Sequence, residues 1–250
     1  MKRGAGEAGP GGAREGHGWW PYLGPYGAFL LVVEFSGRLP EEMAPWMLLV
    51  KPAVPAAMMI YFASRGAYPE LRGLRFQASH TLLDVLLGVA LAVLWMGPYL
   101  LIDALPRPDA ADGFDSAQAG ESLIALVLGA RLVGYAVVTP FFEELFIRSF
   151  VMRYAEAYNR ALDFRDLPLA RYTLRSFSVT VVVFTLGHAP WEWWVAVPWV
   201  AITSLWFYWR RDMSSVIVVH AVTNASILVY VAARTGGLVP STGHPLWIFV

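Results

Sequence analysis

The chain has 250 residues, of which 57% are hydrophobic and only 15% are charged. A soluble domain carries about 25% charged residues, so this chain has too few charges to cover a surface that faces water. The net charge is zero, which gives no indication of nucleic acid as a partner, and the absence of cysteine excludes disulfides, cysteine-ligated metals and thiol nucleophiles. We therefore expect an all-α, polytopic membrane bundle whose surroundings are the lipid bilayer.

The start of the chain differs in composition from the rest. Residues 1–18 are glycine-rich and polar, and we expect a disordered tail there. The apolar stretch that follows ends at Glu34 without the small-residue cleavage site of a signal peptide, so we expect the first helix to be retained. Residues 19–250 are predicted to form a single transmembrane domain.

Apolar segments long enough to cross a bilayer, about 20 residues each, recur along the chain. The pattern predicts about seven spans, with eight as the alternative count. The fourth segment is long and contains Pro140, where we expect a kink or break because proline removes a helical hydrogen bond. The seven predicted spans are residues 19–35, 45–63, 80–104, 121–152, 172–188, 193–209 and 214–233.

The distribution of lysine and arginine predicts the orientation of these spans. Basic residues gather in the N-terminal tail and in the loops after the second, fourth and sixth spans, whereas each opposite loop holds a single arginine. Because cytoplasmic loops carry the excess of basic residues, the N-terminus and segment 153–175 are predicted to be cytoplasmic and segment 103–115 external. We expect a multi-pass protein of a bacterial-type plasma (inner) membrane.

The fourth predicted span carries two adjacent glutamates just after Pro140. Glu144 and Arg148 are four residues apart, so they share one helical face and can form an ion pair. Glu143 lies about 100° round the helix and has no cation at helical spacing, which suits a general base. The alternative is an ion pair at the membrane interface without a catalytic role.

Two later spans carry further polar groups at helical spacing. His188 follows Phe184 by four residues, and Asn224 follows His220 by four. Taken separately, His188 fits a hydrogen-bonded packing histidine, and His220 with Asn224 fits interhelical hydrogen bonding. At 1.5 Å per residue, however, the three clusters lie roughly 13–20 Å from the nearest cytoplasmic arginines, so we expect them in one layer and around one site.

The residue types in these clusters favour hydrolysis of an amide bond. A carboxylate that activates water, with imidazole and amide donors for a developing oxyanion, fits that reaction. The set Glu143, His188 and His220 also has the ligand types to hold one divalent metal such as zinc, although the HExxH motif is absent. On the residues alone, both alternatives stay open.

The motifs EExxxR at 143–148, FxxxH at 184–188 and HxxxN at 220–224 occur in this order on three predicted spans. Together they resemble the CAAX protease and bacteriocin-processing (CPBP) family, which includes the type II CAAX prenyl endopeptidase. The chain is similar in particular to CAAX-protease-related proteins of bacteria. The resemblance covers about residues 140–226, the motif core of a transmembrane protease domain predicted over 19–250. The glycine that often follows the arginine in the family is Ser149 here.

The resemblance implies an intramembrane endopeptidase that acts on a membrane-anchored or lipidated protein or peptide. In that mechanism Glu143 activates water with the assistance of His188, and His220 and Asn224 stabilise the oxyanion. The full set of predicted site residues, with Glu144 and Arg148 in supporting roles, is Glu143, Glu144, Arg148, His188, His220 and Asn224.

The family has been described both as metalloproteases and as metal-independent glutamate proteases. Asn224 is a better hydrogen-bond donor than metal ligand, so we expect that no cofactor is required. A different class of function is a non-catalytic partner or scaffold of a protein-sorting or transport system, and a third is a small transporter that relays protons.

Two cations inside the predicted spans have no local partner at helical spacing. Arg131 lies in the middle of the fourth span, and we expect a structural ion pair with Asp84 or Glu34. Lys51 lies within the second span, and its side chain can extend to the nearer membrane interface.

Overall fold

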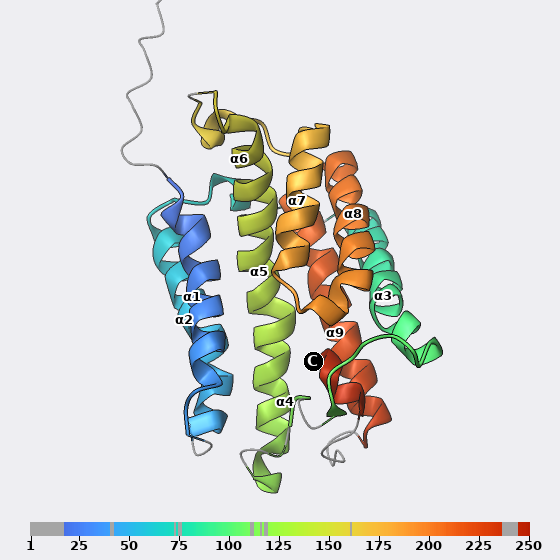
Figure 1. Cartoon of the computed structure of the whole chain (residues 1–250). Helices are drawn as coiled ribbons and strands as arrows, with labels where there is room; N and C mark the ends of the chain where they lie inside the picture. The colour runs from blue at the N-terminus through green and yellow to red at the C-terminus, as the bar shows by residue number, and fades with distance from the viewer. Residues whose placement is uncertain are drawn as a thin grey trace, which may run out of the picture.

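The computed structural model describes residues 18–40, 43–72, 74, 77–110, 113–115, 117, 120–160, 162–236 and 245–250. Over these ranges the chain forms helices, turns and loops, and no strand. Figure 1 shows the long helices running along a common direction as one bundle. The all-α prediction is therefore confirmed, whereas the predicted disordered tail, apart from Gly18, lies outside the described residues.

Within the described residues, a helix occurs at each of the seven apolar segments. The fourth is built from α4, α5 and α6 with two π-helical turns between them. Their bounds are α1 Trp20–Ser36, α2 Ala44–Ser64, α3 Ala78–Leu101, α4 Ile124–Leu132, α5 Thr139–Glu144, α6 Met152–Ala157, α7 Leu174–Leu186, α8 Trp193–Arg210 and α9 Met213–Arg234. Short 3₁₀ turns occupy Pro69–Leu71, Glu121–Leu123, Phe164–Asp166, Pro190–Glu192 and Pro245–Phe249.

In the part of the chain that the structure describes, four helices are long and apolar enough to cross a membrane: Trp46–Ser64, Ala78–Leu101, Glu121–Ala157 and Met213–Arg234. Helix α7 has only 13 residues, or roughly 20 Å at 1.5 Å per residue, against a hydrocarbon core of about 30 Å. Figure 1 shows the connection between α7 and α8 well inside the height of the bundle, while α4 and α9 extend further. This connection places the half-buried residues His188 and Glu192 between α7 and α8.

The helix Glu121–Ala157 does not break at Pro140. Instead, π-helical turns at Val133–Val138 and Leu145–Val151 lie on either side of the short α-helix that contains Pro140, Glu143 and Glu144. A π-helical turn shifts the backbone hydrogen bonds by one residue, and such turns are frequent at functional sites. The two glutamates therefore lie on a short α-helix, and the hydrogen-bond register of the backbone changes before and after it.

Helices α3 and α9 approach each other closely through Gly88. A Cβ atom at this position would lie 2.7 Å from Cβ of Val222 and 2.8 Å from the carbonyl oxygen of Val219, so only glycine fits. The Thr223 hydroxyl, which is buried, donates to the Gly88 carbonyl at 3.1 Å. Small residues that allow two backbones to meet, together with one interhelical hydrogen bond, are typical of packing in membranes.

The basic loops lie at one end of the bundle. Figure 1 shows the start of α1, the connection between α2 and α3 and the connection between α6 and α7 at the same end. There the buried Glu70 accepts hydrogen bonds from Tyr22 and Ser149 and pairs with Arg153 at 3.1 Å. Ser149 thus links the long helix to the loop that follows α2.

Candidate active site

Four of the predicted site residues line one cavity of about 100 Å³. Glu143 comes from α5, His188 from the turn after α7, and His220 and Asn224 from α9. The structure therefore brings together side chains that are up to 81 positions apart, from Glu143 to Asn224 (224 − 143). The cavity wall is otherwise mainly aromatic and aliphatic, with Trp95, Tyr135, Phe184, Trp199 and Ile227 among its residues.

Glu144 and Arg148 form a buried ion pair just outside this cavity. Nε of Arg148 lies 2.9 Å from Oε2 of Glu144, and their side chains are 0% and 1% exposed. The guanidinium also donates to the hydroxyls of Ser204 at 2.5 Å and Thr203 at 2.7 Å, both on α8. These bonds satisfy the charge of Arg148 and fix α5 against α8, as the four-residue spacing predicts for the pair itself.

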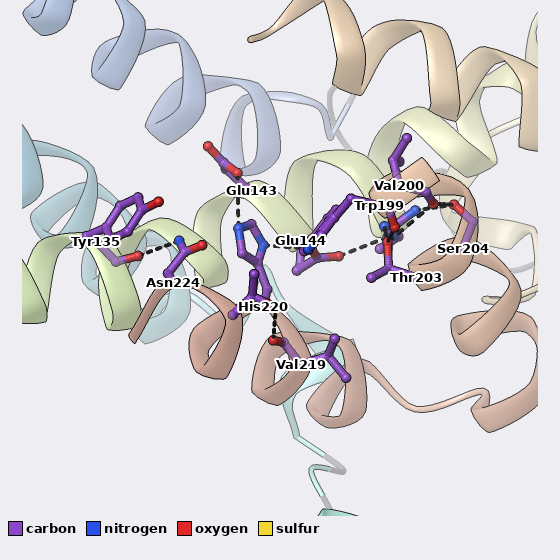
Figure 2. A network of polar contacts seen from close by, with 12 residues as sticks. Tyr135, Glu143, Glu144, Trp199, Val200, Thr203, Ser204, Val219, His220 and Asn224 are labelled. Carbon is purple, nitrogen blue, oxygen red and sulfur yellow. Dashed lines mark hydrogen bonds and ion pairs between the residues drawn. The ribbon is translucent and has the colours of Figure 1, made fainter. Parts of the chain in front are cut away.

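His220 stands between the two adjacent glutamates, as Figure 2 shows. Its Nδ1 lies 2.9 Å from Oε1 of Glu144, and its Nε2 lies 3.7 Å from Oε2 of Glu143. An ionised Glu144 can only accept a hydrogen bond, so the Nδ1 atom of His220 carries a proton and Nε2 faces the cavity. Packing of the ring against Trp199, with ring centroids 4.8 Å apart, holds this orientation.

His188 has a fixed tautomer for a similar reason. Its Nδ1 lies 2.9 Å from the carbonyl oxygen of Phe184, which can only accept, so Nδ1 is the donor. In the neutral ring, Nε2 is then a free acceptor directed away from the helix. The ring packs against Phe184 at 4.5 Å and Trp95 at 5.4 Å between centroids.

Asn224 is held by the first π-helical turn. Its Nδ2 donates to the backbone carbonyl of Tyr135 at 2.7 Å, a contact visible in Figure 2. A primary amide carries two N–H groups, so one remains for a ligand in the cavity. The altered hydrogen-bond register of the turn at Val133–Val138 therefore takes part in positioning the amide.

Tyr135 and Glu192 also contribute polar groups to the site, and the sequence motifs did not identify them. Tyr135 was missed because its contribution is a backbone carbonyl, which no side-chain pattern reveals. Glu192 accepts a hydrogen bond from the Ala189 amide at 3.1 Å, and burial raises its pKa to about 7. One indication of Glu192 is present in the sequence, because it is a charged residue four positions after His188 and directly before the apolar helix α8.

A second cavity, of about 230 Å³, adjoins the first and shares Glu143, His188, Glu192 and other wall residues with it. It also contains Lys51 and Arg131. The predicted pairing of Arg131 with Asp84 or Glu34 is wrong.

Both candidate partners of Arg131 are engaged by other arginines. Asp84 pairs with Arg210 at 3.3 Å, and Glu34 pairs with Arg38. The cause is proximity in the fold, because α3 presents Asp84 to α8, and Glu34 has a cation on its own helical face.

The ligand types for a zinc site were identified in the sequence at Glu143, His188 and His220. Among the residues that the structure describes, no group of three or more His, Cys, Asp and Glu side chains is arranged to hold a metal ion. The Nδ1 atoms of both histidines already have acceptors. That the reaction requires no cofactor stays a prediction.

Comparison with known families identifies the region that contains the site. Residues 125–226 match the family model described as Rce1-like, the type II CAAX prenyl endopeptidase Rce1-like family. This range includes all three motifs and ends two residues after Asn224. Neither the comparison with curated proteins nor the comparison with solved structures gave a match. Residues 125–226 are therefore similar to the CAAX-type membrane proteases, and this similarity supports a relationship with the CPBP family.

Proposed function

We propose that this chain is a membrane-embedded endopeptidase that hydrolyses a peptide bond of a membrane-anchored or lipidated protein, with Glu143 as the general base. The observation that carries the proposal is the single cavity lined by Glu143, His188, His220 and Asn224. Carboxylate, imidazole and amide groups around one cavity are the parts that amide hydrolysis requires.

The first step is the attack of water on the scissile carbonyl carbon. Glu143 accepts one proton of the water, and Nε2 of His188 accepts a hydrogen bond from the other, so the oxygen lone pair is directed at the substrate. Support for the acceptor role of His188 comes from its hydrogen bond to the Phe184 carbonyl, which leaves Nε2 unprotonated in the neutral ring. Positioning of this kind raises the rate of the reaction because the water oxygen and the carbonyl carbon are held in a geometry that favours attack.

The tetrahedral intermediate carries a negative oxygen that needs donors. A protonated His220 offers Nε2–H, since its Nδ1–H is directed at Glu144, and Asn224 offers its second N–H. Glu143 then transfers its proton to the leaving nitrogen, so the C–N bond breaks and the carboxylate is regenerated. Glu144 and Arg148 act as positioning residues, because they hold the imidazole of His220 and touch no substrate atom in this scheme.

We assign the protein to a bacterial-type plasma membrane with a cytoplasmic N-terminus. Support comes from the position of the basic loops at one end of the bundle (Figure 1) and from the general excess of Lys and Arg in cytoplasmic loops. The second candidate function is a non-catalytic scaffold, which would bind its partner without hydrolysing a peptide bond.

The experiment that tests the proposal is a cleavage assay of the purified protein against a panel of lipidated peptides, read by mass spectrometry. We expect cleavage of at least one peptide at a single bond, at a rate that a chelator does not change. Loss of cleavage with the chelator and recovery with zinc would support the metal alternative instead. A well-folded protein that cleaves none of the peptides would favour the scaffold.

A further inference from the structure

Lys51 and Arg131 are two cations in one cavity without an anionic partner among the described residues. They project from α2 and α4 into the cavity of about 230 Å³ that Glu143 and His188 also line. Nε of Arg131 is buried and has no hydrogen-bond partner within the part of the chain that the structure describes. The ring centroids of Phe114 and Tyr135 each lie 5.2 Å from the guanidinium carbon of Arg131, and neither ring supplies a carboxylate that would balance the charge.

The carboxylates of the same cavity are held by other groups. Glu143 faces His220 at 3.7 Å, and Glu192 accepts from the Ala189 amide at 3.1 Å. A buried cation that lacks a partner is destabilising, and arginine or lysine inside a membrane protein typically faces a substrate pathway. Lys51 and Arg131 are half-buried, and like charges in one cavity repel, so an anion that enters this cavity would lower the electrostatic free energy of both.

We infer that Lys51 and Arg131 form an anion-binding subsite of the catalytic cavity that takes a carboxylate of the peptide substrate. The inference rests on the proposed function, because the substrate is taken to be a peptide. Arg131 supplies the planar, two-pronged donor set that matches a carboxylate, and Lys51 supplies a second point charge. Since the same cavity contains Glu143 and His188, a carboxylate held there fixes which bond of the peptide reaches the water.

A neighbouring apolar cavity indicates the form of a suitable probe. Leu48 and Ala130 line both the cationic cavity and a cavity of about 380 Å³ between α2 and α4, whose wall includes Trp46 and Leu126. These latter side chains are 65% and 63% exposed and face outward from the bundle. A ligand that combines an acyl chain with a carboxylate fits both cavities.

The first test uses stability, because a structural ion pair and a ligand subsite give opposite results. We expect Lys51→Gln and Arg131→Gln to unfold at the same temperature as the wild type or higher, since each removes an uncompensated charge. Strong destabilisation of both variants would mean that the two cations have a structural role, and it would overturn the inference.

The second test measures equilibrium binding of N-dodecanoyl-tetra-alanine with a free carboxylate and of its C-terminal amide. The full chain is embedded in neutral phosphatidylcholine nanodiscs, and binding is followed by calorimetry. We expect the ratio of acid affinity to amide affinity to fall about tenfold in K51Q/R131Q and to stay unchanged in the control R107Q, which removes an exposed arginine. The ratio cancels the partition of each probe into lipid.

An equal ratio in the wild type and the double variant, including no binding of either probe, would overturn the inference. The inference would also be overturned if the anion bound at Lys51 and Arg131 were a lipid headgroup. In that case phosphatidylglycerol nanodiscs would raise the unfolding temperature of the wild type but not of K51Q/R131Q. Because binding needs no turnover, a preference for the acid without any cleavage would contradict the proposed function and leave the subsite intact. Cleavage without a preference for the acid would support the proposed function and contradict the anion-binding subsite.

Discussion

The imidazole of His220 contacts the carboxylate of Glu144, with 2.9 Å between Nδ1 and Oε1. Glu144 therefore accepts hydrogen bonds from two side chains at once, because its other oxygen pairs with Arg148 at 2.9 Å. The neighbouring Glu143 contacts the opposite nitrogen of the same ring at the longer distance of 3.7 Å. The two adjacent glutamates thus differ in position: Glu144 holds the imidazole of His220, and Glu143 lines the cavity.

Replacing Glu144 with glutamine should mainly reduce stability. Arg148 is 0% exposed, and removing one partner of a buried ion pair costs about 3–5 kcal/mol. The matched control is Glu34→Gln, which breaks a pair of the same spacing whose side chains are 70% and 64% exposed, where little change is expected. Thermal unfolding in detergent compares the two, and equal unfolding temperatures would contradict the structural role of Glu144.

Asn224→Asp should lower the cleavage rate by about 10²–10³-fold, the range found when one oxyanion donor is removed. The substitution keeps the size of the side chain but replaces its NH₂ donor with an acceptor that also faces the Tyr135 carbonyl. Thr235→Val is a suitable control, since it removes a hydrogen bond to Val231 within the same helix. If Asn224→Asp folds and cleaves at the wild-type rate, Asn224 is not an oxyanion donor.

The contact between α3 and α9 predicts opposite results for two glycines of α3. Gly88→Ala should destabilise the protein by about 1–3 kcal/mol, because the added Cβ meets Val222 and the Val219 backbone. Gly97→Ala should have no such cost, since nothing lies within 4 Å of its Cβ position, and alanine favours a helix. Unfolding midpoints measure both, and a Gly88→Ala variant as stable as Gly97→Ala would rule out the close approach.

Topology can be tested directly because the chain has no native cysteine. Single cysteines in place of Arg171 and Asp109 can be labelled with an impermeant thiol reagent in intact cells. We expect Asp109→Cys to react from outside and Arg171→Cys to react only after the membrane is opened. The reverse pattern would invert the orientation inferred from the loop charges.

The positions of the helices could be predicted because hydropathy is a local property of the sequence. All seven apolar segments form helices, and four helices among the described residues are long and apolar enough to cross a membrane. The π-helical turns around Pro140 could not be predicted, since they depend on backbone hydrogen-bond register rather than on side-chain pattern. A sequence shows that proline disturbs a helix but not how the backbone accommodates it.

The site was partly predictable for a different reason. Glu143, His188 and Asn224 stood out because polar groups in apolar spans are costly, and the pairing of Glu144 with Arg148 followed from their spacing. The partner of Arg131 was predicted wrongly, because Asp84 is taken by Arg210 from another helix. Pairings of this kind join residues 126 positions apart and depend on packing that no local pattern contains.

The most direct measurement of the central claim compares Glu143→Gln with the wild type in cleavage rate and in unfolding temperature. Glutamine keeps the shape of Glu143 but cannot accept the proton of water, so we expect cleavage to fall about 10²-fold or more while the unfolding temperature is unchanged. Glu121→Gln makes the same change at an exposed position of the same long helix and should behave as the wild type. A folded Glu143→Gln variant that cleaves at the wild-type rate would contradict the account.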